Sequence, residues 1–249
     1  MSQNLPEVVL FQNDEKSLGY KFEENAPQLS PKIEIKSIDY DAEDFIKNFE
    51  LIGGKPEENS VFYLNPYKSN TYVHESKADK YFLAEKIALY RLVAYYLGAT
   101  KVESIVTIDE QAILSTDKEG NLSYKFVKAK VRTKKEMEES YFETCHITED
   151  FKLNENYDIK NGIILCEKLI IDNNLQGETE LILLLKTRDS ELVGSQSTKK
   201  TINTEISSEY NSLLEVSATL TSPIFSVSGS FTRSVKTLNK IRVAITFTF

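Results

Sequence analysis

One stretch of the chain repeats its apolar residues with the period of an α-helix. Between about Lys77 and Leu97 these residues recur three or four positions apart. Ser76 and Asp79 have the spacing of a capping box, and Gly98 supplies a left-handed stop. The pattern predicts a helix with its apolar sector buried against a sheet, and aromatic burial explains that sector without a cofactor. The sector contains Phe82, Leu89, Val93 and Tyr96, widened by Tyr81, Ala84, Ala88 and Tyr95.

Many other segments alternate apolar and polar residues, as β-strands with one buried face do. The turn formers of Asp117–Asn121 predict a hairpin between two of them. Shorter helical patterns cover Ala42–Phe49, Asp158–Asp172 and Glu178–Arg188, although the apolar run Leu181–Leu185 also fits a buried strand. The expected strands are Glu7–Gln12, Lys32–Tyr40, Ser60–Asn65, Val102–Ser115, Leu122–Arg132, Tyr141–Ile147, Leu214–Thr221, Ile224–Phe231 and Ile241–Phe249.

Together these elements predict an α+β fold. We expect a twisted antiparallel β-sheet packed by one long central helix and a helical pair. Residues 1–30 are expected to form an irregular N-terminal arm, because Asn13–Pro31 is polar and contains two prolines. Neither a repeat nor a Pro- or Gly-rich linker divides the remainder, so residues 31–249 are expected to form a single domain.

The composition limits the classes of function. The chain has 249 residues, 41% of them hydrophobic, and a formal net charge of −8, which disfavours extended contact with nucleic acid. The N-terminal sequence does not resemble a secretory signal, and no apolar run approaches the length of a spanning helix. Cys145 and Cys166 lie apart in apolar contexts, which indicates reduced thiols. We therefore expect a cytoplasmic protein.

Residues that could carry chemistry do not form a known pattern. His146 follows Cys145, but neighbouring side chains of a strand point to opposite faces, and His74 lies far away in the sequence. The run Gly53–Lys55 has neither the preceding glycine nor the following Ser/Thr of a phosphate loop. The histidines and cysteines also do not have metal-ligand spacing. The sequence thus favours a non-enzymatic protein with no metal and no cofactor.

A loop with two tyrosines is a candidate binding element. Residues 65–72 combine Asn-Pro and other turn formers with Tyr67 and Tyr72, just before the long predicted helix. Such loops often carry binding contacts. The alternative interpretation is an Asn-Pro turn whose tyrosines cover the start of the helix.

A charge-free segment near the C-terminus suggests a function. Val216–Thr232 alternates apolar residues with Ser, Thr and Gly, as a membrane-inserting β-hairpin must. One hypothesis is a β-pore-forming effector that self-associates and inserts into membrane lipid on activation. The alternative is an interaction or assembly module that binds a protein partner through exposed sheet edges. An ordinary sheet with a solvent-facing hydroxyl side also fits. The membrane-facing or interface candidates are Val216, Ala218, Leu220, Phe225, Val227 and Phe231.

Overall fold

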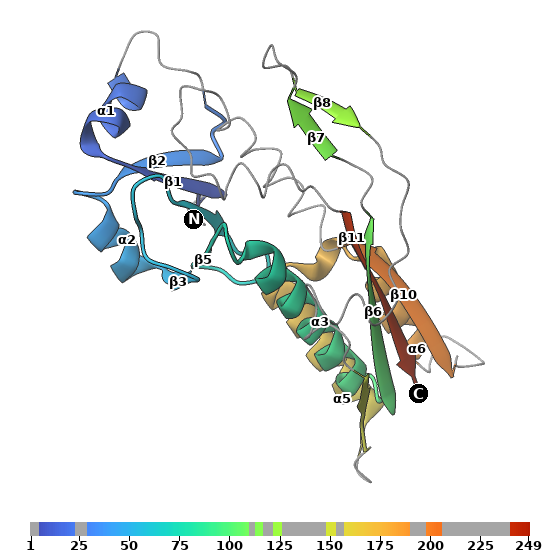
Figure 1. The fold of residues 1–249 in the computed structure, drawn as a ribbon. Helices are drawn as coiled ribbons and strands as arrows, with labels where there is room; N and C mark the ends of the chain where they lie inside the picture. The colour runs from blue at the N-terminus through green and yellow to red at the C-terminus, as the bar shows by residue number, and fades with distance from the viewer. Residues whose placement is uncertain are drawn as a thin grey trace. The chain divides into compact units, whose positions relative to one another are not determined.

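The computed structural model describes residues 5–22, 29–109, 113–116, 122–125, 148–152, 157–189, 198–205 and 240–249 (Figure 1). Over these residues the protein is mixed α/β, with five α-helices and antiparallel sheet segments. The chain divides into two compact units. The described residues of the first unit are those up to Phe82 together with strands β7 (Ile113–Thr116) and β8 (Leu122–Lys125). The rest belong to the second unit, and each unit is described by itself.

The first unit contains a five-stranded sheet in the order β2-β1-β4-β5-β3. β1 pairs with β2, and β3 with β5, in parallel, whereas β4 is antiparallel to its neighbours. An aromatic cluster that includes Phe11, Phe45, Phe62 and Tyr72 packs on one face. The strands are β1 (Val8–Gln12), β2 (Ile33–Ser37), β3 (Glu50–Ile52), β4 (Val61–Leu64) and β5 (Thr71–His74), and the helices are α1 (Asp14–Phe22) and α2 (Ala42–Asn48).

The N-terminal segment differs from the irregular arm expected for residues 1–30. All five residues of β1 are buried, so this strand has no polar face and shows no alternation in the sequence. Helix α1 follows directly. The side chain of Asn13 accepts a hydrogen bond from the Lys16 amide at 3.0 Å, which stabilises the first turn of this polar helix.

The second unit contains a four-stranded antiparallel sheet in the order β10-β11-β6-β9. Val243, Ile245 and Phe247 of β11 are buried on one face, as their alternation predicts. Thr201 and Thr246 form a hydroxyl pair at 2.9 Å on the other face. The strands are β6 (Lys101–Asp109), β9 (Thr148–Asp150), β10 (Lys199–Glu205) and β11 (Lys240–Thr248).

Three helices and one short 3₁₀ turn complete the description. Helix α3 (Ala78–Tyr96) confirms the predicted helix, and the chain leaves it at Gly98, whose φ is +73°. α5 (Ile159–Asp172) and α6 (Thr179–Arg188) confirm the predicted helical pair, so the strand alternative for residues 181–185 is wrong. The 3₁₀ turn Leu175–Gly177 connects them.

The prediction of a single antiparallel sheet is wrong. The described residues form a five-stranded and a four-stranded sheet besides the pair β7–β8, and the five-stranded sheet contains parallel pairs. β7 and β8 pair antiparallel, as the hairpin signal predicts, although the turn at 117–121 lies outside the described residues. The strands predicted at 141–147, 214–221 and 224–231 also lie outside them. That residues 31–249 fold as one domain stays a prediction.

Candidate functional site

Helix α3 exposes an apolar face to solvent. Between Tyr81 and Tyr96 the exposed residues of this helix are Ala84, Ala88, Leu92 and Tyr95, and none of them is charged. Leu92 keeps 44% of its surface accessible and Tyr95 keeps 53%. We call these four residues the α3 face. The solvent side of a helix is normally polar, so this face is unusual.

The four residues share one side of the helix because they lie four, four and three positions apart. The opposite side is packed into the protein core: Ile87, Tyr90, Val93 and Ala94 are each at most 2% exposed. The exposed side of α3 is therefore apolar, and most of its buried side is apolar as well.

The border of the α3 face contains two half-buried charged residues, Glu85 and Arg91. Arg91, half-buried beside the face, binds Glu149 of β9 through Nε at 2.7 Å and also through Nη2. The ring of Tyr95 lies near those of Tyr96 and Phe151, with centroids 5.9 and 5.8 Å apart. The face thus borders an ion pair and an aromatic cluster.

The sequence predicted burial for three of these residues, and this prediction is wrong. Ala84, Ala88 and Tyr95 were expected to widen the sector packed against a sheet, yet all three are exposed. Leu92 was not singled out. One feature of the sequence could have indicated an exposed apolar face. Apolar residues occur around most of the circumference of this helix, and a single packing contact cannot cover all of them.

On its buried side, α3 carries a polar cluster centred on Glu178, the N-cap residue of α6. Lys86 Nζ donates to Glu178 Oε1 at 2.5 Å, while the hydroxyls of Tyr90 and Thr204 each donate to Oε2 at 3.0 Å. The Lys86 side chain is only 1% exposed. Because the carboxylate receives donors from α3 and β10, the cluster ties these elements to α6, a structural role.

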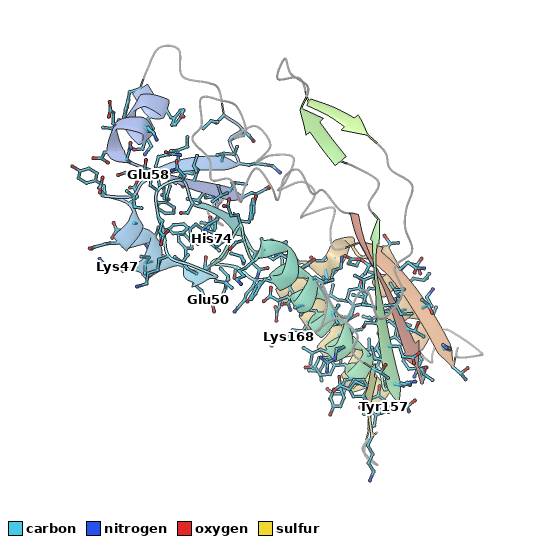
Figure 2. The ribbon with its side chains drawn as sticks, in the orientation of Figure 1. Lys47, Glu50, Glu58, His74, Tyr157 and Lys168 are labelled. Atoms are coloured by element: carbon cyan, nitrogen blue, oxygen red, sulfur yellow. The ribbon has the colours of Figure 1, made fainter. Side chains whose placement is uncertain are left out.

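Tyr157, labelled in Figure 2, and helix α5 hold the C-terminal end of α3. The Tyr157 hydroxyl donates to the Tyr96 carbonyl at 2.9 Å. A Cβ on Gly162 of α5 would lie 1.9 Å from that same carbonyl oxygen, so only glycine fits there. Nearby, Cys166 Sγ lies 3.7 Å from the Val93 carbonyl, and burial raises the pKa of this thiol to about 12. A thiol in this state is a packing residue, not a nucleophile.

In the first unit, His74 of β5 was a candidate for chemistry (Figure 2). Its Nδ1 lies 2.8 Å from Ser76 Oγ and its ring packs edge-on against Phe62. Burial lowers the pKa of His74, and Glu57 opposes this shift in part. The Ser76 amide also donates to Nδ1 at 3.3 Å, so the contact closes the turn before α3. Cys145 and His146 lie outside the described residues.

The two tyrosines proposed as binding residues are buried. Tyr67 is 3% exposed. Tyr72 is fully buried in β5, and its hydroxyl donates to the Pro6 carbonyl at 2.7 Å. Neither side chain is placed to contact a ligand at the surface. The Asn-Pro segment is instead stabilised by Asn65, whose Oδ1 accepts the Tyr67 amide at 2.9 Å.

The six membrane-facing or interface candidates at positions 216, 218, 220, 225, 227 and 231 lie outside the described residues. β11 also alternates apolar with other side chains, although its polar positions include Lys240 and Arg242 as well as Thr246 and Thr248. There, the apolar side is buried within the second unit. In this protein the pattern is therefore compatible with an ordinary sheet.

The described residues contain neither a group of potential metal ligands nor a membrane-spanning helix. Within them, no three His, Cys, Asp or Glu side chains are grouped so as to hold a metal ion. Nor does any helix in that part of the chain combine the length and apolar content needed to cross a bilayer.

Comparison with known proteins provides no family. No family model matches the chain, and neither the curated proteins nor the solved structures contain a match. Function is therefore inferred from the α3 face itself.

Proposed function

We propose that this protein is a non-enzymatic interaction protein that binds another protein chain through the α3 face. The observation that carries the proposal is that every exposed residue of α3 between Tyr81 and Tyr96 is apolar. Single exposed apolar residues are common on protein surfaces, but four on successive turns of one helix form a contiguous stripe. Stripes of this kind are typical of helices that pack against a partner.

The energetics favour coverage of this stripe. Complete burial of a leucine side chain contributes about 1.5–3 kcal/mol, so covering the exposed 44% of Leu92 contributes about 1 kcal/mol. Tyr95 adds a large ring whose neighbours Tyr96 and Phe151 already restrict it on one side, so part of its side-chain entropy is lost before binding.

The α3 face is a better supported surface than the sheet edges that the sequence suggested. β10 is an edge strand of the second sheet, yet it begins with Lys199 and Lys200. Lysines on an edge strand discourage pairing with another chain. Lys200 is also held by Glu180 at 2.9 Å.

Membrane insertion by the charge-free segment at 216–232 stays a prediction. Its measurement is dye release from liposomes by the intact and by the proteolytically trimmed protein. Release that is abolished by charged substitutions at Ser226 and Ser228 would support insertion, and absence of lipid binding in both forms would remove it.

Site-specific photo-crosslinking tests the proposed interaction. A photo-reactive phenylalanine derivative at position 92 should form adducts with another protein chain in cells. Position 183 is the matched control, because Leu183 of α6 is also a leucine in the second unit, 46% exposed against 44% for Leu92. Equal adduct yields at both positions, or no adduct at position 92, would contradict the proposal.

A further inference from the structure

Resting on the proposed function, we propose that the chain covering the α3 face is a second copy of this protein, with its own α3 antiparallel across it. The argument begins with the sizes of the side chains. The N-terminal half of the face carries the small Ala84 and Ala88, and the C-terminal half carries the large Leu92 and Tyr95.

An antiparallel pair places large residues opposite small ones. With a two-fold axis near the level of Tyr90, Ala88 faces the partner's Leu92, and Ala84 faces the partner's Tyr95. Each large side chain then enters the space that an alanine leaves, as knobs enter holes between packed helices. A parallel pair would place alanine on alanine and tyrosine on tyrosine, so that gaps and collisions alternate. The pattern is thus self-complementary in one orientation.

The distribution of charge also permits two α3 faces to pack against each other. The protein carries a net charge of −8, so two copies repel each other on most of their surfaces. The α3 face has no exposed charge, and the neighbouring Arg91 is neutralised by Glu149. The half-buried Glu85 lies on the same side of the helix as Leu92, at the border of the face. A second copy brings the same uncharged centre, so the contact can form while Glu85 stays at its edge.

The area sets the strength of this association. From Ala84 to Tyr95 the face is about 17 Å long on a helix about 10 Å wide, so it covers on the order of 200 Å² per subunit, against about 800 Å² per partner in stable complexes. The half-buried Leu89 and Tyr96 border it and enlarge the contact. We expect a weak dimer with a dissociation constant on the order of 100 μM.

Sedimentation of the purified protein between about 10 μM and 1 mM tests the dimer. The weight-average mass should rise with concentration. Leu92→Asp should raise the dissociation constant about tenfold or more, whereas Leu183→Asp should leave it unchanged. A monomer at all concentrations, or equal effects of the two substitutions, would overturn the dimer. In that case, a crosslink from position 92 to a different protein would leave the proposed interaction standing.

Disulfide trapping tests the orientation. In a background without the native cysteines, mixing Ala88→Cys with Leu92→Cys protein should give a mixed disulfide in excess. Mixing Ala88→Cys with Leu183→Cys should give none. An excess of disulfides between two copies of Ala84→Cys would overturn the antiparallel register, since position 84 lies far from the proposed two-fold axis and meets its own copy only in a parallel pair.

Discussion

The buried ion pair between Lys86 and Glu178 gives the sharpest test of the structure. Glu178→Ala removes the carboxylate that faces the Lys86 ammonium and accepts from Tyr90 and Thr204. The Lys86 side chain is 1% exposed, so its charge cannot gain water in exchange. Removing one partner of a buried pair costs about 3–5 kcal/mol, a large fraction of the about 5–15 kcal/mol that stabilises a typical domain.

The same helix provides a matched control. Glu180 also binds a lysine, Lys200, at 2.9 Å, but these side chains are 50% and 32% exposed. Glu180→Ala should therefore cost less than about 1 kcal/mol. If the cost of Glu178→Ala comes from a buried charge, adding Lys86→Met should recover about 2 kcal/mol or more, because methionine fills similar space without charge.

The assay is urea unfolding at pH 7, followed by far-UV circular dichroism, for the wild type, Glu178→Ala, Glu180→Ala, Lys86→Met and the variant that combines Glu178→Ala with Lys86→Met. Double-mutant comparison separates the pairwise interaction from the individual losses. The reasoning would be refuted if Glu178→Ala and Glu180→Ala had equal costs, or if Lys86→Met added to the destabilisation instead of relieving it.

Three other changes have defined outcomes. Gly162→Ala should destabilise the protein by about 2 kcal/mol or more because its Cβ would collide with a backbone oxygen, whereas Gly177→Ala, with open space around it, should be nearly neutral; thermal unfolding compares them. Burial lowers the pKa of His74, so the unfolded state binds protons first and the free energy of unfolding should fall as the pH drops below about 6.5. His74→Gln should flatten that dependence in urea titrations from pH 7.5 to 5.5, and an unchanged slope would contradict the burial argument. With the second cysteine replaced by serine, Cys166 should react with a thiol reagent at pH 8 only after denaturation, because its pKa is about 12; rapid reaction of the folded protein would be inconsistent with the buried thiol.

The sequence predicted those helices and strands in which apolar residues recur at a regular spacing. α3 ends where Gly98 indicates, and the alternation of β11 correctly assigned Val243, Ile245 and Phe247 to one buried face. β1 was only weakly indicated, because a strand buried on both faces has no alternation. The pattern at residues 65–72 predicts a loop and does not indicate β5, because the turn formers before Thr71 precede a strand of only four residues.

The candidate site could not be predicted in the same way. Periodicity locates the apolar residues of a helix, but which of them is covered depends on tertiary packing. Leu92 and Val93 are adjacent and both apolar, yet Leu92 is 44% exposed and Val93 is fully buried. Likewise, the pairing of Lys86 with Glu178 joins residues far apart in the chain, and neither residue type indicates burial.

The position of β11 has a consequence for biosynthesis. This strand lies between β10 and β6, and its register joins Lys101 to Thr248. Synthesis adds about 5–20 residues per second, so β11 emerges from the ribosome on the order of ten seconds after β6. During that interval β6 has no native partner on that side, so co-translational chaperones have a defined target in this strand.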